Sequence, residues 1–262
     1  MARVFIGVGH GGTDPGAVGY LVEKDVNLKM ARACYDYLQA RGIDTRISRT
    51  GDVTDKLVSK IDRCNAFAPD LALDIHNNAG GGDGFEIFHS VVGGKGKELA
   101  QNIEKEVVKI GQNSRGLKTK KNSYGHDYFG FIRSTICPAV ICEGVFVDNK
   151  ADAAQADTDA ECLAFGEAYA RGILATLGIA DTAGKTDTTS KPNGASGTKT
   201  PAPATGNTSG YKVKVTANGL NIRKDAGVAH TVTGVIRDKG VYTIVAEKTV
   251  SGQKWGKLKS GA

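Results

Sequence analysis

Long apolar segments are missing from this sequence of 262 residues. No run approaches the ~18 apolar residues that a membrane-spanning helix requires, so we expect no membrane insertion. The N-terminus also lacks a charged segment followed by an apolar stretch and a small-residue cleavage site, which together mark a signal peptide. The sequence therefore predicts synthesis in the cytoplasm without an export signal.

Cysteine is scarce and irregularly spaced. The cysteines are odd in number, and no two stand in C-x-x-C spacing, which argues against a disulfide framework and against a zinc site built from thiolates. Most lie in apolar stretches, where buried free thiols are expected. They are Cys34, Cys64, Cys137, Cys142 and Cys162.

Large apolar residues are absent from residues 181–210, which consist mostly of Thr, Gly, Ser, Pro, Ala and Lys. Such a segment cannot bury enough surface to offset the entropy of ordering it, so we expect a flexible linker. It separates a domain over residues 1–180 from a smaller one over residues 211–262.

Positive charge is concentrated in the smaller domain. Residues 211–262 hold 10 Lys+Arg against 3 Asp+Glu, a net charge of +7, whereas residues 1–180 hold 21 against 23 and carry −2. A basic module favours an anionic partner. No nucleic-acid-binding motif is recognisable, so the pattern favours an anionic polymer surface over nucleic acid.

Strand and helix patterns alternate through residues 1–180. Short apolar runs are followed by segments whose apolar residues recur at helical spacing. This alternation predicts an α/β sandwich with a largely parallel sheet. The expected strands are 4–8, 43–48, 71–75, 84–88 and 139–145, and the expected helices are 25–41, 54–68, 97–110 and 159–177.

The first expected strand runs into Gly7, Gly9 and Gly12, which match the G-x-G-x-x-G pattern of dinucleotide-binding loops. That pattern requires a helix to follow at once, because the helix N-terminus holds the pyrophosphate. Here the turn signal TDPG follows at 13–16, and no helix can begin before about Lys24. The acidic residue expected about 20 positions later is also missing, so the dinucleotide interpretation fails.

Four side chains instead indicate metal chemistry at the carboxyl ends of the expected strands, where parallel sheets bind ligands. His10, His76 and Glu143 follow or end strands, and Glu23 stands where the first helix begins. Two histidines and one carboxylate are the ligand set of a catalytic zinc ion with one position open for water. The remaining Glu143 is then the candidate proton carrier. Taken one by one, these residues also suit structural roles, and their spacing alone leaves both interpretations open.

Six segments of the chain appear in the order of a known set of motifs. They are IGVGHGGTDPGAVG, EKDVNL, ALDIHNNA, GFEIF, RGLK and PAVICEGVFVDN. The chain thereby resembles, over about residues 2–178, the zinc-dependent N-acetylmuramoyl-L-alanine amidases of phage endolysins, sporulation and cell separation. The resemblance implies that His10, Glu23 and His76 hold Zn²⁺ and that Glu143 is the catalytic acid/base. It also implies a three-layer α/β/α fold with a mixed, largely parallel six-stranded sheet.

Two features depart from the family pattern. Asp74 stands where the family usually has a small residue, and the segment TKKNSYGHDYFGFIR looks longer and more aromatic than expected before the last strand. We expect this loop to help form the substrate groove. His126 within it is expected to be a surface histidine rather than a second catalytic group.

The basic tail contains five short β patterns, and GLNIRKDAG together with Trp255 resembles the bacterial SH3 domains that bind cell walls. The resemblance implies a small all-β, SH3-like domain that binds anionic cell-wall polymers. Such domains usually continue into a further short strand, which leaves open whether this one is complete.

The expected function is hydrolysis of peptidoglycan at the amide bond between the lactyl group of N-acetylmuramic acid and L-alanine of the stem peptide. Two alternatives stay open: a zinc peptidase acting within the stem peptide, and a non-catalytic wall-binding protein on the same scaffold. The missing export signal fits an endolysin or lysis enzyme, which reaches the bacterial wall after membrane lysis or through a separate pore.

Overall fold

The structure, a computed structural model, describes residues 1–182, 211–215, 220–226, 232–236, 240–250 and 253–258. The chain divides into two units, Met1–Lys185 and Thr186–Ala262. Nearly all of the predicted linker lies outside the described residues. The first unit continues past the predicted boundary at residue 180, because Asp181 accepts a hydrogen bond from the Tyr37 hydroxyl (2.8 Å) and pairs with Arg41.

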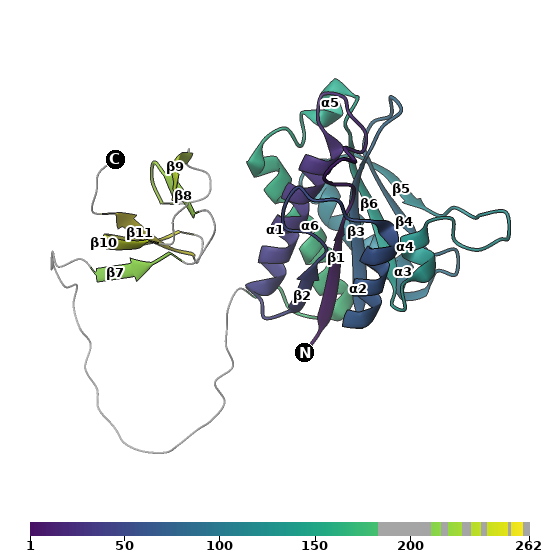
Figure 1. Cartoon of the computed structure of the whole chain (residues 1–262), viewed down its shortest axis with the longest axis horizontal. Coiled ribbons are helices and arrows are strands. Elements are labelled where there is room, and N and C mark those ends of the chain that lie inside the picture. Colours follow the sequence, from purple (N-terminus) through teal and green to yellow (C-terminus); the bar gives the residue numbers. More distant parts are fainter. Residues whose placement is uncertain (183–210, 216–219, 227–231, 237–239, 251–252, 259–262) are drawn as a thin grey trace, which may run out of the picture. The chain divides into compact units, whose positions relative to one another are not determined.

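A mixed sheet of six strands forms the centre of the first unit (Figure 1). The strands are β1 (Arg3–Val8), β2 (Asp44–Ile47), β3 (Leu71–Asn78), β4 (Phe85–His89), β5 (Ser114–Lys118) and β6 (Ala139–Phe146). Their order is β2-β1-β3-β6-β4-β5. Strand β4 runs antiparallel to β6, and every other neighbouring pair is parallel. The predicted mixed, largely parallel sheet is confirmed.

Helices cover both faces of this sheet. Those of the first unit are α1 (Glu23–Gln39), α2 (Leu57–Phe67), α3 (Gly94–Lys109), α4 (Gly130–Ser134), α5 (Lys150–Ala153) and α6 (Asp159–Leu177). Apolar side chains of α1, α3 and α6 form one buried cluster with the sheet, and those of α2 and α4 form a second. The helices on one face, the sheet, and the helices on the other face are the three layers that the sequence predicts.

Alternation along the strands decides which side chains reach the face covered by α2 and α4. In β3, Leu73 and Ile75 belong to the cluster of α1 and α6, so Asp74 and His76 project from the opposite face. In β6, the same alternation brings Glu143 to that face. Because β3 and β6 are parallel neighbours, their polar residues meet at one edge of the sheet.

Three short elements were not predicted from the sequence. Strand β5 lies at the edge of the sheet and reads SRGLK, without the apolar run by which the other strands are recognisable. Helices α4 and α5 have five and four residues, too few for a helical period to show. The four predicted helices are present, with ends that differ from the expected ones by up to a few residues.

The described residues of the second unit form two small sheets. Strands β7 (Tyr211–Lys214), β10 (Val241–Val250) and β11 (Gln253–Leu258) make an antiparallel sheet in the order β11-β10-β7. Strands β8 (Leu220–Arg223) and β9 (Val232–Ile236) form an antiparallel pair. The predicted small β domain is confirmed, while its likeness to bacterial SH3 domains stays a prediction.

No helix in the described part of the chain is both long and apolar enough to cross a membrane. The five cysteines are free thiols, and all but Cys137 are buried.

Candidate metal centre and active site

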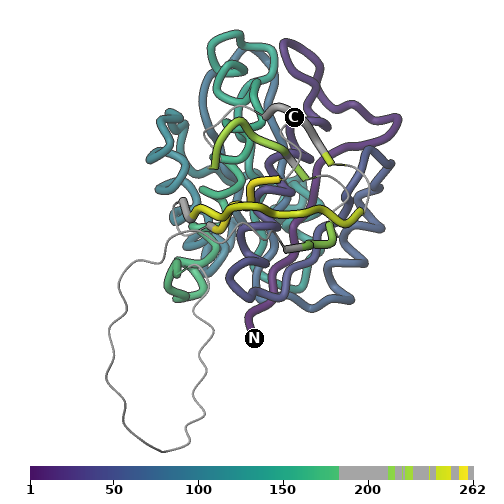
Figure 2. The backbone as a smooth tube through the Cα atoms, turned by 90° about the vertical axis from the view of Figure 1, so that its left-hand side faces the viewer, coloured from purple at the N-terminus to yellow at the C-terminus, as the bar shows by residue number. Residues whose placement is uncertain are grey.

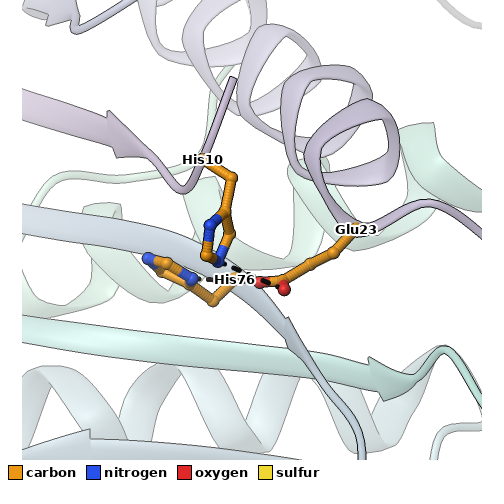
Figure 3. A group of neighbouring side chains, drawn as sticks. All are labelled: His10, Glu23 and His76. Atoms are coloured by element: carbon orange, nitrogen blue, oxygen red, sulfur yellow. Dashed lines mark hydrogen bonds and ion pairs between the residues drawn. The ribbon is translucent and has the colours of Figure 1, made fainter. Parts of the chain in front are cut away.

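Three of the predicted site residues meet at the carboxyl edge of the sheet (Figure 3). His10 lies two residues after the end of β1, Glu23 is the first residue of α1, and His76 lies in β3. His10 Nε2 is 3.2 Å from Glu23 Oε2, and His76 Nδ1 is 3.0 Å from Glu23 Oε1. One potential ligand atom from each residue lies within 4.8 Å of the other two. The glutamate side chain is only 5 % exposed, whereas the histidines are 26 % and 22 % exposed, so the group opens to solvent on the histidine side.

A tight turn after β1 aims His10 at this group. His10 has a φ of +57°, a left-handed conformation that is uncommon for a residue with a side chain. Its Nδ1 lies 2.8 Å from Asp14 Oδ2, and paired backbone hydrogen bonds join Gly11 and Asp14. Figure 2 follows β1 from the N-terminus into the long loop that precedes α1. Such a strained backbone is found mostly at functional sites, where surrounding contacts hold it.

The glycines of this segment leave room for the metal centre. A Cβ atom on Gly9 would lie 2.4–2.6 Å from three ring atoms of His76. A Cβ on Gly16 would lie 2.5 Å from Glu23 Oε2 and 2.7 Å from the His10 ring. Because they lack a Cβ atom, these glycines allow the imidazole rings and the Glu23 carboxylate to pack against the backbone of the opening segment.

Buried amides hold Glu23 in place. Its Oε2 accepts a hydrogen bond from the Ala17 backbone N–H (2.9 Å), and its Oε1 accepts one from the Asn77 backbone N–H (3.2 Å). The Asn77 side chain donates to Asn27 Oδ1 (2.7 Å) and accepts from the Val145 backbone N–H (2.9 Å). Sequence reasoning missed both asparagines, although Asn27 stands four residues after Glu23, on the same face of α1.

Electrostatic coupling within the group is strong. Burial opposes the charge on Glu23, but hydrogen bonds and charge from His10 and His76 outweigh it and hold the pKa of Glu23 well below its usual range. Burial likewise lowers the pKa of His76, yet its contacts with Asp74 and Glu23 dominate and raise it to about 10. Metal ions bind the deprotonated ligands, so a cation here competes with protons on the histidines.

Glu143 stands beside this group rather than within it. On β6 it is the register partner of His76 on one side and of Glu86, on β4, on the other. Burial is the largest cause that raises the pKa of Glu143 to about 7, against the opposing charge of His76. Glu86 was not singled out from the sequence, and it accepts hydrogen bonds from Arg115 Nε (2.7 Å) and Asn78 Nδ2 (3.1 Å).

A cavity of about 250 Å³ adjoins the two histidines on the side of α2 and α4. Phe129 and Gly130, which lie in the aromatic loop (the segment TKKNSYGHDYFGFIR, residues 119–133), belong to its wall, whereas His126 is exposed and does not line it. The lining residues are His10, Asp14, Asp55, Leu57, Lys60, Asp74, His76, Phe129, Gly130, Phe131 and Ile141. The cavity therefore combines an apolar wall with the exposed side of the metal-ligand group.

Comparisons with known proteins agree on one family. Residues 4–175 match a family model described as N-acetylmuramoyl-L-alanine amidase. The endolysin of Bacillus phage SPP1 is 30% identical over 268 residues, covering 98% of this chain and 93% of that protein. The N-acetylmuramoyl-L-alanine amidase CwlM of Bacillus licheniformis is 33% identical over 178 residues, covering 66% of this chain and 68% of that protein. Among solved structures, the catalytic domain of CwlV, an N-acetylmuramoyl-L-alanine amidase from Bacillus (Paenibacillus) polymyxa var. colistinus, aligns with a TM-score of 0.62 and 26% identity, over 69% of this chain and 100% of that chain.

Proposed function

The chain belongs to the N-acetylmuramoyl-L-alanine amidase family, and we propose that it hydrolyses peptidoglycan through a zinc centre held by His10, Glu23 and His76. The bond cut joins the lactyl group of N-acetylmuramic acid to L-alanine of the stem peptide. The observation that carries the proposal is the convergence of two imidazole nitrogens on one buried carboxylate beside a solvent-open cavity.

The donor set fits zinc. Catalytic zinc ions take three protein ligands from histidine and carboxylate groups, with one position free. Here His10 Nε2, His76 Nδ1 and the Glu23 carboxylate face one another, and these would be the ligand atoms. When bound, Zn²⁺ supplies a Lewis acid that activates water and polarises the scissile carbonyl.

Glu143 moves the proton in this proposal. Its register partner on β3 is the proposed ligand His76, and the charges of His76 and Glu23 act on its carboxyl group, which supports a role beside the ligands. It accepts a proton from the attacking water and returns it to the departing nitrogen of L-alanine. A pKa raised to about 7 by burial suits a group that must both take and give a proton near neutral pH.

The cavity beside the histidines is the proposed seat of the substrate around the scissile bond. Leu57, Phe129 and Ile141 supply apolar wall, while His10 and His76 belong to the same lining. We propose that the aromatic loop takes part in substrate binding through Phe129.

The second unit is proposed to bind the cell wall. Its net charge of +7 over residues 211–262 suits anionic wall polymers, and the similarity to a phage endolysin extends over 98% of the chain. We therefore propose that the protein acts at the bacterial cell wall as an endolysin or a related lysis enzyme.

Mass spectrometry of digested purified walls tests the proposed reaction. The expected products carry a free L-alanine amino group, with glycan and stem peptide both intact. Cleavage between residues of the stem peptide supports the zinc-peptidase alternative, and an undigested wall supports a binding protein. The His76→Ala variant is the control, because digestion by that variant reveals a contaminating hydrolase.

A further inference from the structure

A buried ion pair lies directly beside the metal-ligand group. Lys60 Nζ of α2 is 2.8 Å from Asp74 Oδ1 and 3.1 Å from Asp74 Oδ2. The two side chains are 4 % and 2 % exposed. Asp74 stands two residues before His76 on the same face of β3, and its Oδ2 lies 3.5 Å from His76 Nε2. The pair therefore touches a proposed zinc ligand from the side opposite Glu23.

The neighbouring strand leaves space for this pair. Gly7 of β1 is the register partner of Asp74. A Cβ atom on Gly7 would lie 2.4 Å from Asp74 Oδ1 and 3.1 Å from Lys60 Cδ. Gly7, Asp74 and Lys60 thus form one packing unit, drawn from β1, β3 and α2.

Each of the two histidines has a carboxylate near both of its ring nitrogens. One nitrogen of each faces Glu23, and the other faces an aspartate: Asp14 Oδ2 is 2.8 Å from His10 Nδ1, and Asp74 Oδ2 is 3.5 Å from His76 Nε2. Metal-binding histidines typically donate their outer N–H to a carboxylate, which fixes the tautomer and the ring orientation. Asp14 is 61 % exposed whereas Asp74 is 2 % exposed, so water screens only the first contact strongly.

We propose that Asp74, neutralised by Lys60, is a positioning residue that keeps the hydrogen of the His76 imidazole on Nε2 and its lone pair on Nδ1, toward the metal. The proposal rests on the zinc centre proposed above. Lys60 allows the carboxylate to stay buried, because an unpaired charge at this depth would be strongly destabilising. Stability alone gives little reason to keep such a pair, since apolar residues of similar volume often replace a buried ion pair without loss.

Replacing both Lys60 and Asp74 by apolar residues distinguishes a positioning role of Asp74 from a purely structural role of the ion pair. In Lys60→Met/Asp74→Leu, residues of similar size fill the space, so the folded protein keeps its packing but loses the carboxylate beside His76. We expect a zinc affinity about 10- to 100-fold below that of the unchanged protein, as is usual when the outer partner of a ligand is lost. Zinc affinity is measured by competition with a chromophoric chelator, and the urea midpoint of unfolding is recorded for the same samples.

Two further variants make the result decisive. Glu106→Gln/Arg171→Met removes an ion pair between α3 and α6, away from the ligands, and should leave zinc affinity unchanged. Should Lys60→Met/Asp74→Leu not fold, Lys60→Met/Asp74→Ala makes the same comparison with a smaller side chain. A folded variant without Asp74 that binds zinc as tightly as the unchanged protein overturns the positioning role. If the unchanged full-length protein binds no zinc, the proposed metal centre itself fails, which is a different outcome.

Discussion

Replacing Gly9 by alanine should damage the metal centre while adding only one methyl group. The added Cβ would lie 2.4–2.6 Å from three ring atoms of His76, where an ordinary contact needs about 3.5 Å or more. The ring must therefore move by roughly 1 Å, which exceeds the ~0.5 Å within which a functional group must be held. A misplacement of this size typically lowers a rate about 100-fold, and overpacking of this kind costs about 1–3 kcal/mol of stability.

Gly51→Ala is the matched control for this experiment. A Cβ on Gly51 meets no atom within 4 Å, so the same chemical change should leave zinc affinity and activity as they are. Zinc affinity by chelator competition and the release of L-alanine amino groups from soluble muropeptides are the two readouts. A Gly9→Ala protein that binds zinc and turns over substrate like Gly51→Ala would refute the reasoning from packing.

The remaining predictions concern metal, proton transfer, pH and the second unit. Chelation should abolish wall digestion and zinc should restore it, while His76→Ala should lose the metal by elemental analysis, because two remaining ligands hold zinc poorly. Glu143→Gln should keep its zinc but lose about 100-fold or more in kcat, and loss of zinc in that variant would contradict the role given to Glu143. In metal-free protein the raised pKa of Glu143, about 7, means that the folded state holds the proton more tightly than the unfolded state. Urea unfolding in chelator should therefore show the unchanged protein losing stability relative to Glu143→Gln from about pH 5 to pH 7, and a pH-independent difference would contradict the burial of this carboxyl. Residues 1–185 alone should keep activity on soluble muropeptides but digest whole walls less well than the full chain, by a margin that shrinks as salt screens the basic unit; equal digestion at low salt would remove wall binding from the account.

The large elements could be predicted because their signals are local. Apolar runs and helical periods each lie within one segment, and they located the central strands and the four long helices. Strand β5 has no such signal, because an edge strand with exposed side chains such as Arg115 needs no apolar pattern. Its pairing with β4 is a property of the tertiary structure.

The site could be predicted only in part, for a related reason. His10, His76 and Glu143 were recognisable because they stand at or near the carboxyl ends of the strands that the sequence predicts, although β3 and β6 continue two and three residues beyond His76 and Glu143. Asn77 and Lys60 gave no such signal, since their side chains act on partners that the sequence does not place next to them: Asn27 for the first and Asp74 for the second. Asp74 was visible only as a departure from the family pattern, and its partner explains how this chain tolerates it.

The glycines of the opening segment show how one pattern can have two physical causes. G-x-G-x-x-G lets a backbone approach a pyrophosphate in dinucleotide-binding proteins. In this chain, Gly7 makes room for the Asp74 carboxylate and Gly9 makes room for the His76 ring. The sequence excluded the phosphate interpretation, but only the structure supplies the reason for the spacing.

Anomalous diffraction at the zinc absorption edge, on crystals of the zinc-loaded protein, tests the central claim most directly. The account predicts a single strong peak in the first unit, about 2.0–2.1 Å from His10 Nε2 and from His76 Nδ1, with the Glu23 carboxylate as the third ligand. Glu143 should lie beside the peak without coordinating it. A peak held by other residues, or none at these three side chains in protein that digests walls, would contradict the account.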